Sequence, residues 1–197
     1  MLKSVEFVVT VNYKVFRGRK MNDLNVIDEV EGLYKIISLK VFRKTQGVIF
    51  DMVPKWIVEN TKAIDRVIHE KSAQSPGSVE EVERPWYMHP HQADNLIVLS
   101  GERHVDLYNV KHGQIEKFDV TKDYVKKNGE LITEDGGMLI WPTYVFHRIV
   151  SGENGSASIN FAIHYEGFDI TTNFSIYDLN IDTGEYHVIR EGFKDQF

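Results

Sequence analysis

The sequence predicts an all-β fold, a sandwich or a barrel, on three observations. From residue 85 onward, short apolar segments follow one another at close spacing. Turn-forming sequences separate them at residues 111–113, 128–129, 153–155 and 182–184, which is typical of small β-sandwiches and barrels. Near the N-terminus, apolar residues from Val5 to Val15 alternate with polar ones, the period of a strand with one buried face. No internal repeat is visible, so we expect a single barrel.

The first 84 residues are expected to extend this barrel. Residues 35–42 and 47–52 look like two strands. Residues 54–69 look like the one helix, because Pro54 is tolerated in a first turn and an apolar stripe follows it. The stripe consists of Trp56, Ile57, Ile64, Val67 and Ile68. Residues 72–84 are expected to be an exposed loop. The predicted organisation is one structural domain, with residues 1–84 as strands, helix and loop packed on a barrel of residues 85–197.

Composition limits the classes of partner. The chain has 197 residues and a net charge of −6, with scattered rather than clustered lysine and arginine, which argues against nucleic acid. No apolar stretch approaches the length that spans a membrane, and the N-terminal sequence does not resemble a signal peptide, so a cytoplasmic protein is expected. The long apolar strand at residues 5–15 offers an edge that a second copy can cover, which predicts a homodimer.

Three histidines form the pattern that says most about chemistry. His89 and His91 are separated by one residue, and on an extended segment such a pair points both imidazoles to the same face. His147 follows a distant apolar segment that begins with Gly136 and Gly137. Because the chain has no cysteine, a metal must be held by nitrogen and oxygen ligands, and neutral imidazole is a common ligand of divalent metals.

These residues resemble the two motifs of the cupin superfamily over roughly residues 85–165. The second motif has glycine, five residues, proline-x-glycine, two residues and histidine; Gly136, Pro142 and His147 match it, and Tyr144 replaces the second glycine. The first motif has the His-x-His pair, a glutamate and a glycine. Here the histidines and glycine match and the glutamate is absent, with Asp94 or Asn95 standing near its place. The resemblance implies a single cupin double-stranded β-helix, or jelly-roll, barrel.

The first functional hypothesis is a metal-dependent enzyme that acts on a small oxygenated molecule. It places a divalent metal on His89, His91 and His147, with Asp94 as fourth ligand. Three imidazoles leave open coordination positions, as catalytic sites do. Iron would favour dioxygenase chemistry, whereas zinc, manganese or nickel would favour an isomerase or a lyase.

Strand alternation adds candidates for the rest of the site. Tyr87 shares the face of the histidine pair, and Asn160 and His164 share the polar face of the strand at residues 156–164. We assign Tyr87 and His164 to catalysis, and Tyr144 and Asn160 to substrate binding. Arginines that can meet an anionic substrate are Arg84, Arg103 and Arg148, although Arg148 lies on the opposite face from His147.

Two further hypotheses stay open. The run from Asp94 to Gly101 followed by Val105 to Tyr108 is similar to cupin-type sugar-nucleotide epimerases and isomerases. That resemblance implies chemistry without metal, with His89 or His91 as base and Tyr144 or Tyr87 as acid. The other is a non-catalytic small-molecule-binding cupin, since pirin-like members share the His-Pro-His sequence. Pirin-like sites carry a glutamate where Ile149 stands in this chain.

Overall fold

The computed structural model describes residues 25–196, and it confirms the all-β prediction. Its elements are β1 (Val26–Val30), β2 (Tyr34–Ser38), β3 (Lys40–Thr45), β4 (Val48–Met52), α1 (Lys55–Val58), β5 (Ala63–His69), β6 (Gln74–Ser75), β7 (Trp86–Met88), β8 (Gln92–Tyr108), β9 (Glu116–Thr121), β10 (Val125–Lys127), β11 (Glu130–Thr133), β12 (Gly137–Trp141), β13 (Phe146–His164), α2 (Ile170–Asn173), β14 (Ile176–Leu179), β15 (Tyr186–Arg190) and the 3₁₀ turn η2 (Gly192–Asp195). The strand predicted at residues 5–15 lies outside the described residues.

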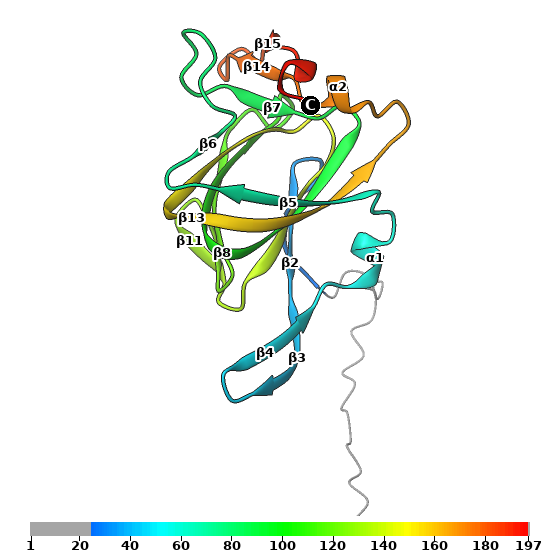
Figure 1. Cartoon of the computed structure of the whole chain (residues 1–197), viewed down its shortest axis with the longest axis vertical. Helices are drawn as coiled ribbons and strands as arrows, with labels where there is room; N and C mark the ends of the chain where they lie inside the picture. The colour runs from blue at the N-terminus through cyan, green and yellow to red at the C-terminus, as the bar shows by residue number, and fades with distance from the viewer. Residues whose placement is uncertain (1–24, 197) are drawn as a thin grey trace, which may run out of the picture.

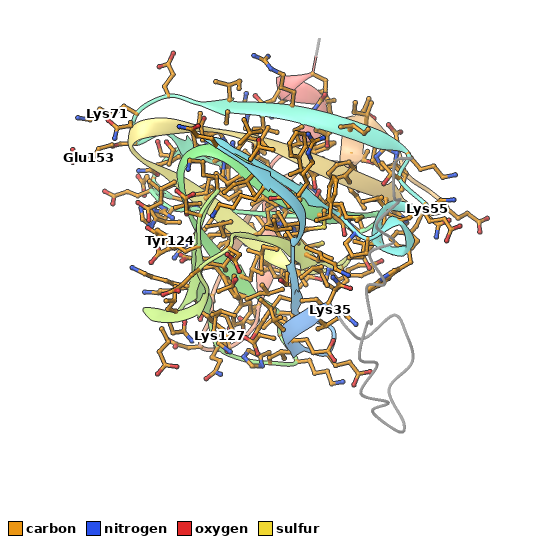
Figure 2. The ribbon with its side chains drawn as sticks, turned by 90° about the horizontal axis from the view of Figure 1, so that it is seen from below. Lys35, Lys55, Lys71, Tyr124, Lys127 and Glu153 are labelled. Atoms are coloured by element: carbon orange, nitrogen blue, oxygen red, sulfur yellow. The ribbon has the colours of Figure 1, made fainter. Side chains whose placement is uncertain are left out.

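The strands wrap into a barrel around one interior (Figure 1). A 13-stranded sheet contains β1-β2-β12-β8-β13-β7-β14-β15 in this order, and β5, β6 and the β9–β11 meander pair onto it. Its two long strands, β8 and β13, run antiparallel and pair along almost their whole length. The strands β1, β2 and β5 of the predicted N-terminal extension belong to this same sheet. Charged side chains such as Lys71 and Glu153 project outward from the barrel (Figure 2).

Both long strands bend at glycines, and this bend lets each strand serve two walls of the barrel. The register of β8 and β13 shifts between Ser151 and Ser156, next to the pair Gly101–Ser156. Gly101 and Gly155 both have φ +70°, a backbone conformation that residues with a side chain rarely adopt. A Cβ on Gly101 would overlap the carbonyl oxygen of Gly155. The motif glycine seen in the sequence is therefore required by a close approach of two backbones.

An apolar cluster fills one part of the barrel interior. It combines side chains from β2, β8, β9 and β12, among them Ile36, Leu96, Val105, Phe118 and Leu139. A second cluster, with Ile37, Met138 and Ile57, packs α1 on the outer face of β2 and β12. Burial of this kind is the dominant stabilising contribution to a small domain. The remaining interior is open to ligand and is described below.

The long helix predicted at residues 54–69 is wrong. The structure has a helix of only four residues, Lys55–Val58, and then the strand β5. In β5 the burial alternates, with Ile64, Arg66 and Ile68 exposed. Seven consecutive residues of β5 pair with β13. The apolar residues at 64, 67 and 68 fit a helical stripe as well as a strand, and pairing with β13 decides between them.

The hairpin of β3 and β4 is a separate two-stranded sheet that projects from the barrel (Figure 1). All of its strand residues are exposed, including Phe42, Ile49 and Phe50. An isolated two-stranded hairpin is marginally stable in water.

Within residues 25–196, no helix is long and apolar enough to cross a membrane.

Gly101→Ala is expected to lower the free energy of unfolding by about 2–3 kcal/mol, because it adds a backbone clash to the cost of a positive φ. The matched control is Gly113→Ala, since Gly113 has φ +74° but a Cβ added there would meet no atom within 4 Å. The control is expected to cost about 1 kcal/mol. Urea denaturation measures both, and equal losses would show that the close approach of the strands is unimportant.

Candidate functional site

A cavity of about 220 Å³ lies inside the barrel. Its apolar walls include Leu96, Trp141, Ile149 and Phe174, and a few polar side chains converge between them. The volume is below the roughly 300–1,000 Å³ of sites for drug-sized ligands. The cavity therefore has room for a small molecule or for one ring of a larger one.

His89 lies at the end of β7, buried, with its two ring nitrogens in different environments. Nδ1 lies 2.7 Å from the carbonyl oxygen of Asn173 in α2. Because a carbonyl oxygen only accepts hydrogen bonds, Nδ1 carries the proton of the neutral ring and Nε2 presents a lone pair. Nε2 is 3.6 Å from Asp94 Oδ2. The imidazole is thus held in the tautomer of a base, with a carboxylate beside it.

Only one of the two carboxylate oxygens of Asp94 accepts hydrogen bonds from the described residues. Its Oδ1 accepts hydrogen bonds of 2.7 Å from Gln92 Nε2 and from Asn160 Nδ2. Its Oδ2 is buried and has no hydrogen-bond partner among the described residues. Asn160 is itself oriented, because its side-chain oxygen accepts the backbone N–H of Asn95 at 2.7 Å. Oδ2 is therefore free to receive a proton-bearing group, and a protonated His89 is the nearest candidate.

His147 and Tyr87 complete this wall of the cavity. Their strands, β13 and β7, place them opposite each other. The ring centroids of His147 and His89 are 4.6 Å apart, and Tyr87 lies 6.2 Å from His89 and 6.0 Å from His147. Burial first, and then the neighbouring His89, lower the pKa of His147 to about 3. Burial raises the pKa of Tyr87, so at neutral pH the imidazole of His147 is neutral and the phenol of Tyr87 is protonated.

Three of the residues predicted for the site do not line this cavity. His91 packs against Gly167, because Pro90 and His91 form a bend between β7 and β8 that ends the alternation of an extended strand. Tyr144 is 58% exposed, with φ +62°, in the place of the motif glycine. His164 stacks on Phe168 with the ring centroids 3.6 Å apart. The predicted residues that line the cavity are Asp94, Asn160, Tyr87, His89 and His147, together with Arg103 of the three candidate arginines.

Several residues of the cavity were not predicted. His69 was expected at the end of a helix and lies on β5, where it faces the interior. Gln92 and Phe174 also line the cavity. Gln92 shares the inward face of β8 with Asp94, so its position could have been inferred from strand alternation. Phe174 follows the short helix α2, and no sequence pattern links that segment to the barrel interior.

Comparison with solved structures defines the class of fold. An epimerase, dTDP-6-deoxy-D-glucose-3,5-epimerase RmlC from Legionella pneumophila, in complex with dTDP-4-keto-L-rhamnose, has a TM-score of 0.54 and 12% identity, covering 83% of this chain and 82% of that one. The RmlC epimerase from Mycobacterium tuberculosis has a TM-score of 0.50 and 8% identity, covering 71% of this chain and 66%, just under two thirds, of that one. The fold is that of a cupin-type jelly roll. More particularly, it is the RmlC-like form of that fold.

Comparisons of sequence add no family. No family model matches the chain, and no curated protein matches it at the level of sequence.

The prediction of a divalent metal cofactor, whether iron, zinc, manganese or nickel, is wrong. The similar structures are RmlC-like epimerases, which are metal-independent, and one of them is in complex with a dTDP-sugar. The geometry separates the predicted ligands: His89, Asp94 and His147 have potential ligand atoms within 4.8 Å of one another, whereas the bend at Pro90 turns His91 away. What the cavity presents is the imidazole of His89 beside the carboxylate of Asp94.

His147 is expected to make stability depend on pH. Its folded pKa of about 3 lies below its ordinary value of 6.5, so between these values the unfolded chain binds the extra proton. Stability is therefore greatest above about pH 6.5 and falls toward pH 3, by up to about 1.4 kcal/mol per pH unit from this group.

Urea denaturation between pH 7 and 4.5 checks this expectation. His147→Gln should reduce the dependence on pH, and His187→Gln, at an exposed position on β15, should leave it unchanged. If wild type and His147→Gln have parallel pH profiles, the buried neutral imidazole does not contribute.

Proposed function

We propose that the protein is a metal-independent epimerase or isomerase that moves a proton on a carbon next to the carbonyl group of a sugar. The observation that carries this proposal is the pairing of His89 with Asp94 inside the cavity. The proposal is supported by the RmlC-like fold, which the chain shares with epimerases of nucleotide-linked keto sugars.

His89 acts as the base. Its Nε2 lone pair takes the proton from the carbon, so that the C–H bond breaks, an N–H bond forms, and the electron pair moves to the carbonyl oxygen as an enolate. The resulting imidazolium has Asp94 Oδ2 at 3.6 Å on one side and the Asn173 carbonyl on the other. A buried carboxylate stabilises such a cation much more than it stabilises the neutral ring.

Tyr87 acts on the carbonyl oxygen of the sugar. Burial raises the pKa of this phenol, which keeps it protonated as a hydrogen-bond donor for the enolate. His147 stays neutral, with Nδ1 3.2 Å from the carbonyl oxygen of Val145. Its Nε2 is then an acceptor for a sugar hydroxyl. The cavity of about 220 Å³ takes the sugar ring, and a nucleotide, if attached, lies outside the barrel interior.

The test is exchange of carbon-bound hydrogen with solvent. The protein is incubated in D₂O with dTDP-4-keto-6-deoxyglucose, and deuterium in the sugar is measured by mass spectrometry and NMR. His89→Asn is expected to slow exchange by about 100-fold or more. The matched control is His104→Asn, at a position outside the cavity and hydrogen-bonded to Asp119 at 2.7 Å. It is expected to retain the wild-type rate.

The alternative hypothesis of a non-catalytic binding module predicts a different outcome of the same experiment. It would give saturable binding of the keto sugar without deuterium incorporation in the wild type. Exchange that survives in His89→Asn would instead reject His89 as the base.

The cytoplasmic location stays an expectation from the sequence.

We also propose that the protein is a homodimer. The β3–β4 hairpin supports this, because Phe42 is 57% and Ile49 is 58% exposed on a sheet of only two strands. Large exposed apolar surfaces of this kind mark interaction sites. A second copy that packs on the hairpin would bury these side chains.

Ile49→Asp is expected to convert the dimer to a monomer, because it places a charge in the interface. Lys44→Asp is the control, since it changes a charge on the same hairpin without removing apolar surface. Sedimentation velocity at micromolar concentration measures the mass. A monomeric wild type, or a variant Ile49→Asp that stays dimeric, would reject the hairpin as the interface.

A further inference from the structure

Arg103 is a buried cation that faces the same cavity. It lies on β8 just beyond the bend at Gly101, is 1% exposed, and lines the cavity with the histidines. Its Nε donates to Ser156 Oγ at 3.1 Å, and one Nη donates to the backbone carbonyl of Val67 at 3.1 Å. Both partners are neutral, so these bonds orient the guanidinium without balancing its charge.

The charge of Arg103 has no counterion within the described part of the chain. Among residues 25–196, no carboxylate oxygen lies within 4.0 Å of its guanidinium. Burial lowers its pKa to about 10, so the group remains protonated at neutral pH. Buried charges in proteins are normally paired, because an unpaired one costs a large desolvation energy. An unpaired guanidinium that lines a cavity is therefore suited to an anion supplied by a ligand.

The surroundings of Arg103 contain further unused polar atoms. Its two partners belong to alternate cross-strand pairs of β5 and β13, Val67–Ser158 and His69–Ser156, which are separated by one pair. In these pairs Ser158 Oγ and His69 Nδ1 are buried and have no hydrogen-bond partner among the described residues. Burial first, and then the charge of Arg103, lower the pKa of His69 to about 4. His69 is thus neutral and offers a hydrogen bond rather than a second charge.

We propose that Arg103 forms a carboxylate subsite at the inner end of the cavity and that the substrate is a sugar acid, a hexuronate-type ring. This inference rests on the proposed function, whose substrate class it names. One cation with neutral donors balances a carboxylate, whereas a phosphate monoester would leave a second negative charge buried. The planar guanidinium also matches the planar carboxylate.

The subsite lies on the same cavity wall as the Asp94 carboxylate. The wall of Asp65, Asn160 and Asp94 is joined by hydrogen bonds of 3.1 and 2.7 Å. Val67, which holds Arg103, lies two residues farther along β5, about 7 Å in strand geometry. Arg103 and the Asp94–Asn160 pair are thus held by nearby residues of one strand and line the same cavity as His89. In the proposal the carboxylate contacts Arg103, and the carbon that loses its proton lies near His89.

The test compares D-glucuronate, D-glucose and inorganic phosphate as ligands of the full-length protein, by isothermal titration calorimetry or ligand-detected NMR. The wild type is expected to bind D-glucuronate about tenfold or more tightly than D-glucose. Arg103→Gln should remove this preference, and Arg103→Lys should retain part of it. Thermal unfolding of each variant establishes that it is folded.

Each outcome decides the proposal. An equal affinity of the wild type for glucuronate and glucose overturns it without reference to any variant. Tighter binding of phosphate than of glucuronate also overturns it, in favour of a phosphate subsite. A preference for glucuronate that persists in a folded Arg103→Gln protein places the carboxylate elsewhere. A preference without hydrogen exchange in any keto sugar would reject the proposed function and leave the subsite standing.

Discussion

The antiparallel pairing of β8 with β13 is the constraint on which the rest of the structure depends. These two strands are long enough to cross the barrel twice, and they can do so because both bend where Gly101 meets Gly155. Because of the bend, the two halves of each strand belong to different walls of the barrel. Asp94 lies before it and Arg103 after it, so one strand supplies a carboxylate to one end of the cavity and a guanidinium to the other. A straight β8 would not face one interior with both charges.

The chemistry of the site depends on a second, smaller constraint. His89 is directed by a backbone carbonyl from α2, which follows the long strand β13, and not by a side chain. The same segment supplies Phe174, whose ring packs edge-on against His89 at a centroid distance of 4.8 Å. The polar groups around Asp94 are similarly oriented by their neighbours. The reactive groups are held by their neighbours before any ligand enters, which is how a site avoids reorganisation during a reaction.

Much of the fold could be read from the sequence, because period-2 alternation and turn residues are local signals. The inward faces of His89 and Asn160 follow from that reading, whereas Gly101, Asp94 and His147 were identified through the resemblance to the cupin motifs. It failed where local signals were ambiguous or interrupted. Residues 64–68 suit a helix or a strand, and only pairing with β13 makes them β5. The His-x-His pair looks extended, yet the bend at Pro90 separates its members. The role of α2 depends on a contact between residues 84 positions apart in the chain, which no periodicity reports.

Under the proposed function, the attachment of His89 to α2 links the position of this helix to the reactivity of the imidazole. α2 contributes both the carbonyl that fixes the imidazole tautomer and, through Phe174, part of the cavity wall. A displacement of this short helix would move that part of the wall and release Nδ1 from its acceptor. The proton of the neutral ring could then move to Nε2, and the base would lose its lone pair toward the interior. Under the proposed function, the imidazole is therefore basic toward the ligand only while this part of the cavity wall is in place.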